Sequence, residues 1–336
     1  MTNKTVCNTL SLLLSSFDLI SYKAKLLVAA GFYGIPMPTT EIINLANPLF
    51  DCEMWAALPL GTPAQAAVGG FLGNGMIMCG GQKENDIFTE DCYLITSDNV
   101  RQIHSLSKPL MGPAGAIINN TLYVTGGFSK IDNTHINGTE FVSLEGSRPG
   151  PMLPINVADH CVIKIDNETL LLTGGSHVIG RDHVKLKSTW FFTLSNESWS
   201  KGPDMLEARW KHACGSLRLK DGSQVLVVAG DFFEGKNRLI DSVEILDLSP
   251  DFPEWTSGPI SLPIDPSNSD VEVGLGHQIV SNDEYLYYIN TYQNLFYQLE
   301  CENVTACNWT KLETAKLKFP RTSAIVSLVP NEFVNC

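Results

Sequence analysis

The feature that most constrains the fold of this chain is a short apolar run that ends in glycine and returns throughout the sequence. Well-preserved copies read MIMCGG, LYVTGG and LLLTGG, whereas the copy YLYYIN has lost its glycine. The copies end at Gly31, Gly81, Gly127, Gly175, Gly230 and Asn290. They lie roughly 50 residues apart, which is the spacing of a repeat architecture. The 336 residues therefore predict one array of similar units, not the two or three domains that this length would otherwise suggest.

A tryptophan follows the apolar run in four of these units, at Trp55, Trp199, Trp255 and Trp309. Two glycines at the end of a strand allow another segment to approach the backbone where a Cβ atom would clash. A tryptophan supplies a large apolar plate between sheets, with an N–H group that can reach a carbonyl. We interpret these glycines and tryptophans as parts of the scaffold and not as a functional site.

The glycine pair, the downstream tryptophan and linkers such as SKGPDMLEARWKHACGSL resemble the kelch repeat. The resemblance covers nearly all of residues 25–329. It implies an all-β fold, a six-bladed kelch-type β-propeller with four strands in each blade. Blade one begins at Leu26 with its second strand, whereas the C-terminal segment TSAIVSLVP resembles the first strands of other blades. We therefore expect the C-terminal strand to complete blade one and close the ring.

The N-terminal residues are similar to a secretory signal. Lys4 precedes a short apolar stretch from Val6 to Leu14, which two serines follow. We expect a signal peptide over residues 1–21 and a propeller over residues 22–336, with an ordinary N-terminal extension as the alternative. No apolar run in the sequence approaches the roughly 18 residues that a membrane span requires.

Sequons and cysteines both favour an extracellular location. Sequons begin at Asn119, Asn137, Asn167, Asn196, Asn303 and Asn308. An even number of cysteines remains if Cys7 leaves with the signal peptide. The blade order implied by the resemblance pairs Cys79–Cys92, Cys301–Cys307, Cys52–Cys336 and, as the remaining pair, Cys161–Cys214. Buried free thiols are the alternative for Cys161 and Cys214.

The resemblance also implies two different faces. Turns between the first and second strands, and between the third and fourth, lie on one face, and the longer loops and linkers lie on the other. All these sequons except that of Asn137 fall in or beside such turns, so we expect glycans on one face. The other face would bind a ligand, with plain solvated loops as the alternative. The candidate binding residues are His135, His177, Arg181, Asp182, His183, Arg209, Lys211, Asp231, Glu234 and Lys236.

Histidines recur near the start of three expected inner strands, at His160, His212 and His277. Histidines around a channel can bind a metal, but kelch linkers often carry one at this position, so we expect no metal. We also expect none at His177 and His183, because loops of this kind rarely hold a metal site. The sequence has no nucleophile-elbow, zinc-protease, P-loop or dinucleotide-binding motif, and we expect no cofactor.

The acidic composition limits the classes of partner that the protein is expected to bind. A net charge of −13 and a pI of about 4.9, without clustered lysine or arginine, argue against nucleic-acid and membrane partners. Intracellular kelch proteins often serve ubiquitin ligases through an added BTB-type domain, for which this chain has no room. We expect a secreted monomer whose long loops bind an extracellular protein or glycan, with binding favoured over catalysis. Kelch-like propellers include a sialic-acid mutarotase, so the first alternative is a carbohydrate-active enzyme with its site at the channel mouth. The second is a structural extracellular component without a discrete ligand.

Overall fold

The structure is a computed structural model that describes residues 25–32, 37–45, 55–59, 62, 65–180, 182–233, 238–251, 253–264, 277–282 and 284–334. Within these residues, the regular structure consists of β-strands and two short 3₁₀ turns, η1 (Glu84–Asp86) and η3 (Asn331–Phe333). No helix in this part of the chain is long and apolar enough to cross a membrane. The expected all-β fold is confirmed. The expected signal peptide lies outside the described residues.

Five antiparallel sheets have four strands each, and each sheet is named below by its innermost strand. The β3 sheet contains β3 (Val68–Leu72), β4 (Gly75–Cys79), β5 (Asp91–Ile95) and β6 (Val100–Ser105). The β8 sheet contains β8 (Ala114–Ile118), β9 (Thr121–Thr125), β12 (Thr139–Val142) and β13 (Ser147–Pro149). The β14 sheet contains β14 (Cys161–Lys164), β15 (Thr169–Thr173), β18 (Thr189–Thr193) and β19 (Ser198–Lys201). The β20 sheet contains β20 (Ala213–Arg218), β21 (Gln224–Phe233), β22 (Arg238–Asp247) and β23 (Trp255–Ser257). The β24 sheet contains β24 (His277–Ser281), β25 (Leu286–Asn290), β26 (Leu295–Asn303) and β27 (Ala306–Lys311).

Three smaller sheets complete the described strands. One joins β28 (Ile325–Val329), β1 (Lys25–Ala29) and β2 (Thr40–Asn44). The others are β7 (Leu110–Met111) with β10 (Phe128–Ser129) and β11 (Thr134–His135), and the hairpin of β16 (Ser176–Ile179) and β17 (Asp182–Lys185). The last strand, β28, pairs antiparallel with the first, so that Lys25 lies opposite Val329 and Ala29 lies opposite Ile325.

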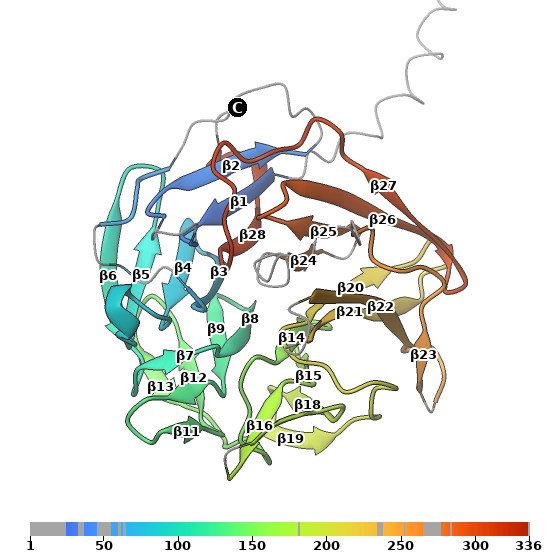
Figure 1. Cartoon of the computed structure of the whole chain (residues 1–336), viewed down its shortest axis with the longest axis horizontal. Coiled ribbons are helices and arrows are strands. Elements are labelled where there is room, and N and C mark those ends of the chain that lie inside the picture. The colour runs from blue at the N-terminus through green and yellow to red at the C-terminus, as the bar shows by residue number, and fades with distance from the viewer. Residues whose placement is uncertain are drawn as a thin grey trace, which may run out of the picture.

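The sheets are arranged around a common centre (Figure 1). Each of the innermost strands β3, β8, β14, β20, β24 and β28 contacts the next, and β28 contacts β3. The core lies between neighbouring sheets: Val227 and Ile245 of the β20 sheet, for example, share a buried cluster with Tyr288 of the β24 sheet. Such radial packing of twisted antiparallel sheets makes the protein a β-propeller.

Backbone hydrogen bonds connect the linkers that lead into successive inner strands. The N–H of Gly112 donates to the carbonyl of Ala66 at 3.0 Å, and the N–H of Asp159 donates to Gly112 at 3.0 Å. The N–H of Lys211 then donates to the carbonyl of Asp159 at 2.8 Å. All four residues have a left-handed backbone, with φ from +50° to +63°. A left-handed residue reverses the chain direction within one step, which lets each linker turn into its inner strand.

The need for glycine at the end of the second strand is explained by the close contact that the next sheet makes there. A Cβ atom on Gly174 would lie 2.5 Å from the carbonyl oxygen of Arg209 and 2.9 Å from Cε1 of His212. The imidazole of His212, just before β20, therefore packs against the glycine that follows β15. Its Nε2 lies 2.9 Å from Oγ1 of Thr173, so the threonine before the glycine pair completes the contact.

Trp199 and Trp255, on the fourth strands of two neighbouring sheets, have the expected scaffold role. The indole N–H of Trp199 donates to the carbonyl of Pro151 at 3.2 Å, and that of Trp255 donates to Pro203 at 3.0 Å. Each tryptophan thereby ties its strand to the linker that enters its own sheet. Because the indole combines a large apolar ring with one donor, it can pack and hydrogen-bond at the same place.

Three of the four expected disulfides are present. Cys79–Cys92 and Cys301–Cys307 each join directly opposite residues of adjacent strands. Cys161–Cys214 joins β14 to β20 and therefore crosses between two sheets. The alternative that Cys161 and Cys214 are buried free thiols is therefore wrong. Cys52 and Cys336 lie outside the described residues.

Two glycine substitutions should separate contact from backbone conformation. Gly174 and Gly180 both have positive φ, but nothing lies within 4 Å of a Cβ built on Gly180. We expect Gly174→Ala to lower the free energy of unfolding by about 3 kcal/mol and Gly180→Ala by about 1 kcal/mol. Urea denaturation measures both. Equal losses would show that the packing of His212 on Gly174 contributes nothing.

The disulfide that crosses between sheets should matter most for stability. The chain-entropy relation gives about 4 kcal/mol for the 53-residue separation of Cys161 and Cys214, and about 2 kcal/mol for the 6-residue separation of Cys301 and Cys307. We expect the double alanine variant of the first pair to lose more stability than that of the second. Denaturant unfolding under non-reducing conditions tests this order, which the reverse ranking would contradict.

Candidate functional site

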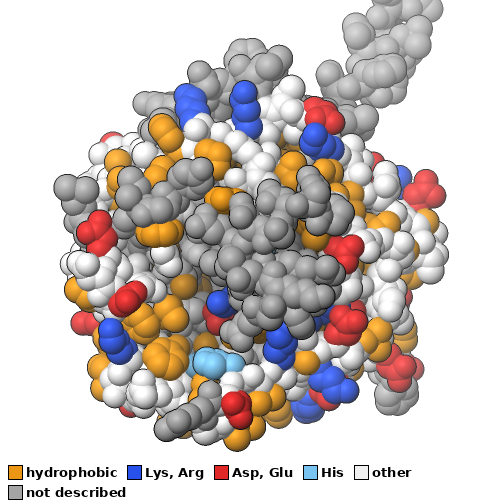
Figure 2. All heavy atoms as spheres, in the orientation of Figure 1, with side chains coloured by type: hydrophobic (Ala, Val, Ile, Leu, Met, Phe, Trp, Pro, Cys, Tyr) orange, Lys and Arg blue, Asp and Glu red, His pale blue; other side chains and the backbone are white. Residues whose placement is uncertain are grey.

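The two faces of the propeller are made from different kinds of segment. In the β3 sheet, the turns 73–74 and 96–99 lie at one end of the strands, while loop 80–90 and linker 106–113 lie at the other. The same order of strands holds in the other four-stranded sheets. We call these two sides the turn face and the long-loop face. The long-loop face is turned toward the viewer in Figure 1 and Figure 2.

Exposed apolar side chains gather on the long-loop face. Among the described residues, seven large hydrophobic side chains are exposed, by 40% to 73%. Four stand on loops between second and third strands: Ile87, Ile131, Ile179 and Val184. The other three stand on linkers: Met152, Leu206 and Phe319. Figure 2 shows hydrophobic patches on this face, broken by single charged groups. Exposed apolar patches of this kind are typical of interaction sites.

The turn face has the opposite character. Exposed carboxylates lie in its turns at Asp98, Glu145, Asp166, Glu168, Glu197, Asp221, Asp251, Glu254 and Glu284. Lys220 is the one basic residue in the described turns. The sequon asparagines expected on this face, Asn119, Asn167, Asn196, Asn303 and Asn308, are exposed. Asn137, on the other side, is half-buried and donates its side-chain amide to the carbonyl of Leu153 at 3.2 Å. Glycosylation at these positions stays a prediction.

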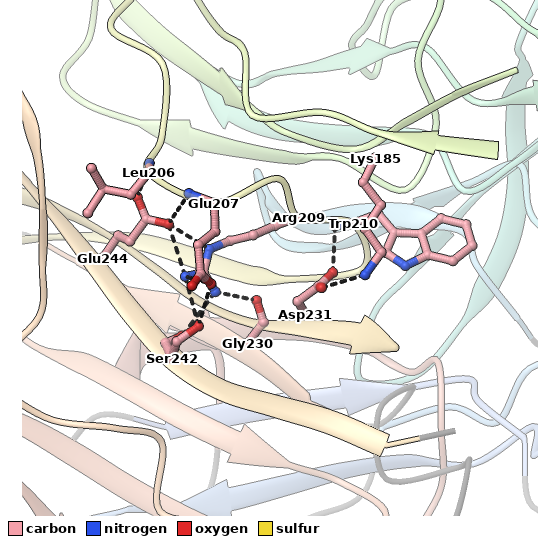
Figure 3. A network of polar contacts seen from close by, with 9 residues as sticks. All are labelled: Lys185, Leu206, Glu207, Arg209, Trp210, Gly230, Asp231, Ser242 and Glu244. Atoms are coloured by element: carbon pink, nitrogen blue, oxygen red, sulfur yellow. Dashed lines mark hydrogen bonds and ion pairs between the residues drawn. The ribbon is translucent and has the colours of Figure 1, made fainter. Parts of the chain in front are cut away.

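A network of polar contacts lies beneath the long-loop face, around Arg209 (Figure 3). The Arg209 side chain is fully buried, and its Nε donates to Glu244 at 3.0 Å. Its Nη1 donates to the carbonyls of Gly230 and Ser242 at 2.8 and 3.0 Å. Glu244 also accepts the backbone N–H of Leu206 at 2.6 Å. These bonds fix the linker that enters β20, so Arg209 supports the face from beneath and does not project from it.

Asp231 extends this network to the β16–β17 hairpin. Its Oδ2 lies 2.5 Å from Nζ of Lys185 on β17, and its Oδ1 accepts the backbone N–H of Trp210 at 3.1 Å. Burial raises the pKa of Asp231, although the ion pair with Lys185 opposes this. The carboxylate therefore joins three segments, namely β21, β17 and the linker into β20 (Figure 3).

A second buried arginine repeats the arrangement where the chain enters β28. Arg321 is fully buried, pairs with Glu41, and donates from Nη1 to the carbonyl of Thr39 at 2.8 Å. Arg209 and Arg321 each stand two residues before a left-handed residue, Lys211 and Ser323. Sequence reasoning missed Arg321 and Glu41. The signal that could have found them is the shared position of the two arginines in their linkers.

Aromatic rings line the junction between β11, β17 and the linker into β20. His135 is 3% exposed, and its Nδ1 donates to the carbonyl of Ser176 on β16 at 2.9 Å. Its ring centroid lies 5.8 Å from that of Phe128 and 5.4 Å from that of His183. His183 lies 6.0 Å from Trp210. Burial, together with repulsion from His183, lowers the pKa of His135 to about 4.

The centre of the ring contains a channel. One cavity of about 410 Å³ lies at the mouth, and a second of about 460 Å³ shares wall residues with it, including Gly69, Val162 and Ile279. His160, His212 and His277 line the mouth.

The polar atoms of these three imidazoles are not available to a ligand in the channel. Their Nε2 atoms lie 2.7 to 2.9 Å from Thr125 Oγ1, Thr173 Oγ1 and the Lys211 carbonyl, while their Nδ1 atoms are buried without a partner. Burial lowers the pKa of His160 to about 3 and that of His277 to about 4. The described residues include no group of three or more His, Cys, Asp or Glu side chains that could hold a metal ion.

The candidate binding residues divide by exposure. Asp182 and His183 are exposed, and His177 and Lys211 are half-buried. His135, Arg209 and Asp231 are buried and hold the loops together. Arg181, Glu234 and Lys236 lie outside the described residues. The exposed isoleucines of the long loops were not anticipated, because an apolar residue in a loop carries no sign in the sequence of whether it folds inward.

Comparison with known proteins supports the fold only. No protein-family model matches the chain, and no curated protein sequence matches it. Among solved structures, it is similar to one described as "Structure of YjhT", with a TM-score of 0.62 and 11% sequence identity. The similarity covers 81% of this chain and 91% of that chain. At this identity, the likeness indicates a shared β-propeller fold.

The buried ion pair should be far more important for stability than an exposed one. Replacing Arg209 by methionine leaves Glu244 charged and buried, which we expect to lower the free energy of unfolding by about 3 to 5 kcal/mol. The matched control is Arg148→Met, because Arg148 pairs with Glu197 at the surface and its side chain is 57% exposed. We expect that change to cost less than about 1 kcal/mol. Equal effects in urea unfolding would contradict this assignment.

Proposed function

We propose that this protein is a secreted, glycosylated, six-bladed kelch-type β-propeller that binds an extracellular protein through its long-loop face. The five four-stranded sheets would be five blades, and β28, β1 and β2 would belong to the sixth. The pairing of β28 with β1 and its contact with β3 support a ring closed by the C-terminal strand. Three disulfides support an oxidising compartment. Residues 1–21 would be the signal peptide and residues 22–336 the propeller.

The segregation of exposed apolar side chains carries the proposal. All seven large ones among the described residues belong to long loops or linkers. Ile131 and Ile179 are exposed by 70% and 60% on loops of neighbouring sheets, and strands β11 and β16 of these loops are in contact. Interface energy usually comes from a few apolar anchors inside a polar rim. The turn face offers carboxylates and sequons instead, so glycans there would leave the long-loop face free.

A protein partner is favoured over a glycan. Recognition of a sugar requires polar groups aimed outward, but several charged groups on this face bond to each other. Lys83 pairs with Asp91 and Lys108 pairs with Asp132, each at 2.7 Å. Large apolar side chains are exposed on the same face, and apolar surface is matched by another protein.

Binding is also favoured over catalysis. A carbohydrate-active enzyme of the mutarotase kind would need acid–base groups that face the channel mouth. The imidazoles of His160, His212 and His277 line this mouth, but each Nε2 is already bonded within the protein and each Nδ1 is buried. Proton transfer to a bound sugar would first require these contacts to break.

Surface substitutions should locate the binding face. The secreted protein is tested against an array of extracellular proteins and, in parallel, against a glycan array. We expect a protein ligand whose affinity falls at least tenfold in Ile131→Asp and in Ile179→Asp, because a charge at an apolar anchor opposes burial. Both side chains are exposed, so folding should be unaffected. Ser195→Asp, an exposed turn-face change beside the Asn196 sequon, is the control and should bind normally. Binding that depends on Ser195, or a ligand found only on the glycan array, would overturn the proposal.

A further inference from the structure

We propose that the long-loop face is acid-sensitive, because neutral imidazoles clamp the β16–β17 hairpin in place and their protonation releases it. The hairpin carries Ile179 and Val184, two of the exposed apolar side chains, so its release would dismantle the contact surface. The inference rests on the proposed function, since it concerns the regulation of that same face. The partner would therefore be bound at neutral pH and released in an acidic compartment.

Six of the seven histidines of the chain gather on the long-loop side: His135, His160, His177, His183, His212 and His277. Their charged forms act on one another in a continuous series. His135 is repelled by His183 and His177, and it in turn acts on His160. Burial lowers the pKa of His212, and repulsion from Arg209, His277 and His160 lowers it further. Imidazole is the side chain whose charge ordinarily changes between pH 5 and 8, so this concentration makes the region respond to acid.

His135 is the clamp. It lies on β11 in the β7–β10–β11 sheet, whereas the carbonyl that accepts its Nδ1–H belongs to Ser176, the first residue of β16. Its ring is enclosed by Phe128 on one side and by His183 of β17 on another. Both strands of the hairpin are thus held by one buried imidazole that donates one proton and carries no charge.

The charges around His135 do not favour a second proton. Among the described residues, the ionisable groups that act on it are His183 on β17 and His177 on β16. The carboxylate of Asp231 reaches the hairpin only through Lys185, and it also accepts the N–H of Trp210. The flanking linker adds Lys211, whose ammonium group lies 5.0 Å from the Trp210 ring.

The direction of the pH effect follows from linkage. In the docked hairpin the pKa of His135 is about 4, whereas a released imidazole titrates near 6.5. The released state therefore binds more protons between these values. Docking is strongest above pH 6.5 and weakens as the pH falls toward 4. Between pH 6.5 and pH 5.0, one such histidine shifts the equilibrium by roughly 15-fold.

Hydrogen exchange of the hairpin amides measures its release without any partner. Two backbone bonds join the hairpin to the neighbouring linkers: the N–H of Ser176 donates to the carbonyl of Ala158 at 2.8 Å, and the N–H of Arg209 donates to the carbonyl of Leu186 at 2.9 Å. Both amides should therefore be protected only while the hairpin is docked. We expect their protection factors, corrected for intrinsic exchange, to fall about 10- to 15-fold between pH 6.5 and 5.0. Amides of the β20 sheet should keep theirs. Equal hairpin protection at both pH values would overturn the proposal.

Two glutamine variants assign the effect to its source. In His135→Gln, the amide can still donate to Ser176 but takes up no proton, so protection should become independent of pH over this range. His104→Gln is the control, since His104 bonds to the carbonyl of Leu144 in a different part of the fold and should respond as the wild type does. If His135→Gln does not fold, the exposed His183→Gln should show a smaller acid response than the wild type. A full acid response in a folded His135→Gln, or in His183→Gln, would overturn the clamp.

The result is separable from that of the binding experiment. A hairpin that opens in acid while Ile131→Asp leaves binding intact would keep the clamp and remove its role in this interface. A hairpin that stays closed while Ile131→Asp abolishes binding would remove acid sensitivity and leave the binding face in place.

Discussion

The structure depends on the contact between the glycine pair that ends one sheet's second strand and the histidine that begins the next sheet. Gly174 lacks the Cβ atom that would strike His212, and Thr173 supplies the oxygen that its Nε2 meets. Gly126, Thr125 and His160 repeat the contact one sheet earlier. Because the contact joins neighbouring sheets, it fixes the distance between them and also holds them together. Each linker must return the chain to the start of the next inner strand, where this contact forms. The left-handed residues of the linkers and the network around Arg209 hold the chain in that position.

The linkers and the loops have different roles on the long-loop side. The linkers into β20 and β28 are each held by a buried ion pair, which is costly to desolvate and must be fully hydrogen-bonded to be tolerated. Arg209 meets this condition with Glu244 and backbone carbonyls, and Arg321 does so with Glu41 and Thr39. On the loops, by contrast, isoleucine and valine side chains are exposed to solvent.

Much of the fold could be predicted from the sequence because its signals are periodic. The repeat of strand and glycine gave the sheets, and the order of the units gave the pairs Cys79–Cys92, Cys161–Cys214 and Cys301–Cys307. The site was less predictable, because the residues that become buried in a linker do not recur at a regular spacing in the sequence. From the sequence alone, Arg209 and Asp231 are expected to be surface charges, because the segments that cover them are not known. Ile131 cannot be distinguished from any other loop residue. The small β7–β10–β11 and β16–β17 sheets are made from loop segments whose strands are too short to show an alternating pattern.

The pairing of β28 with β1 also has a consequence for biosynthesis. Strand β1 can pair with β2 as soon as both have been made, yet its other edge waits for residues 325–329, much farther along the chain. Until then this edge presents unpaired backbone groups, which are a template for strands of other molecules. Synthesis of the chain therefore leaves one strand edge open to aggregation until β28 has been made.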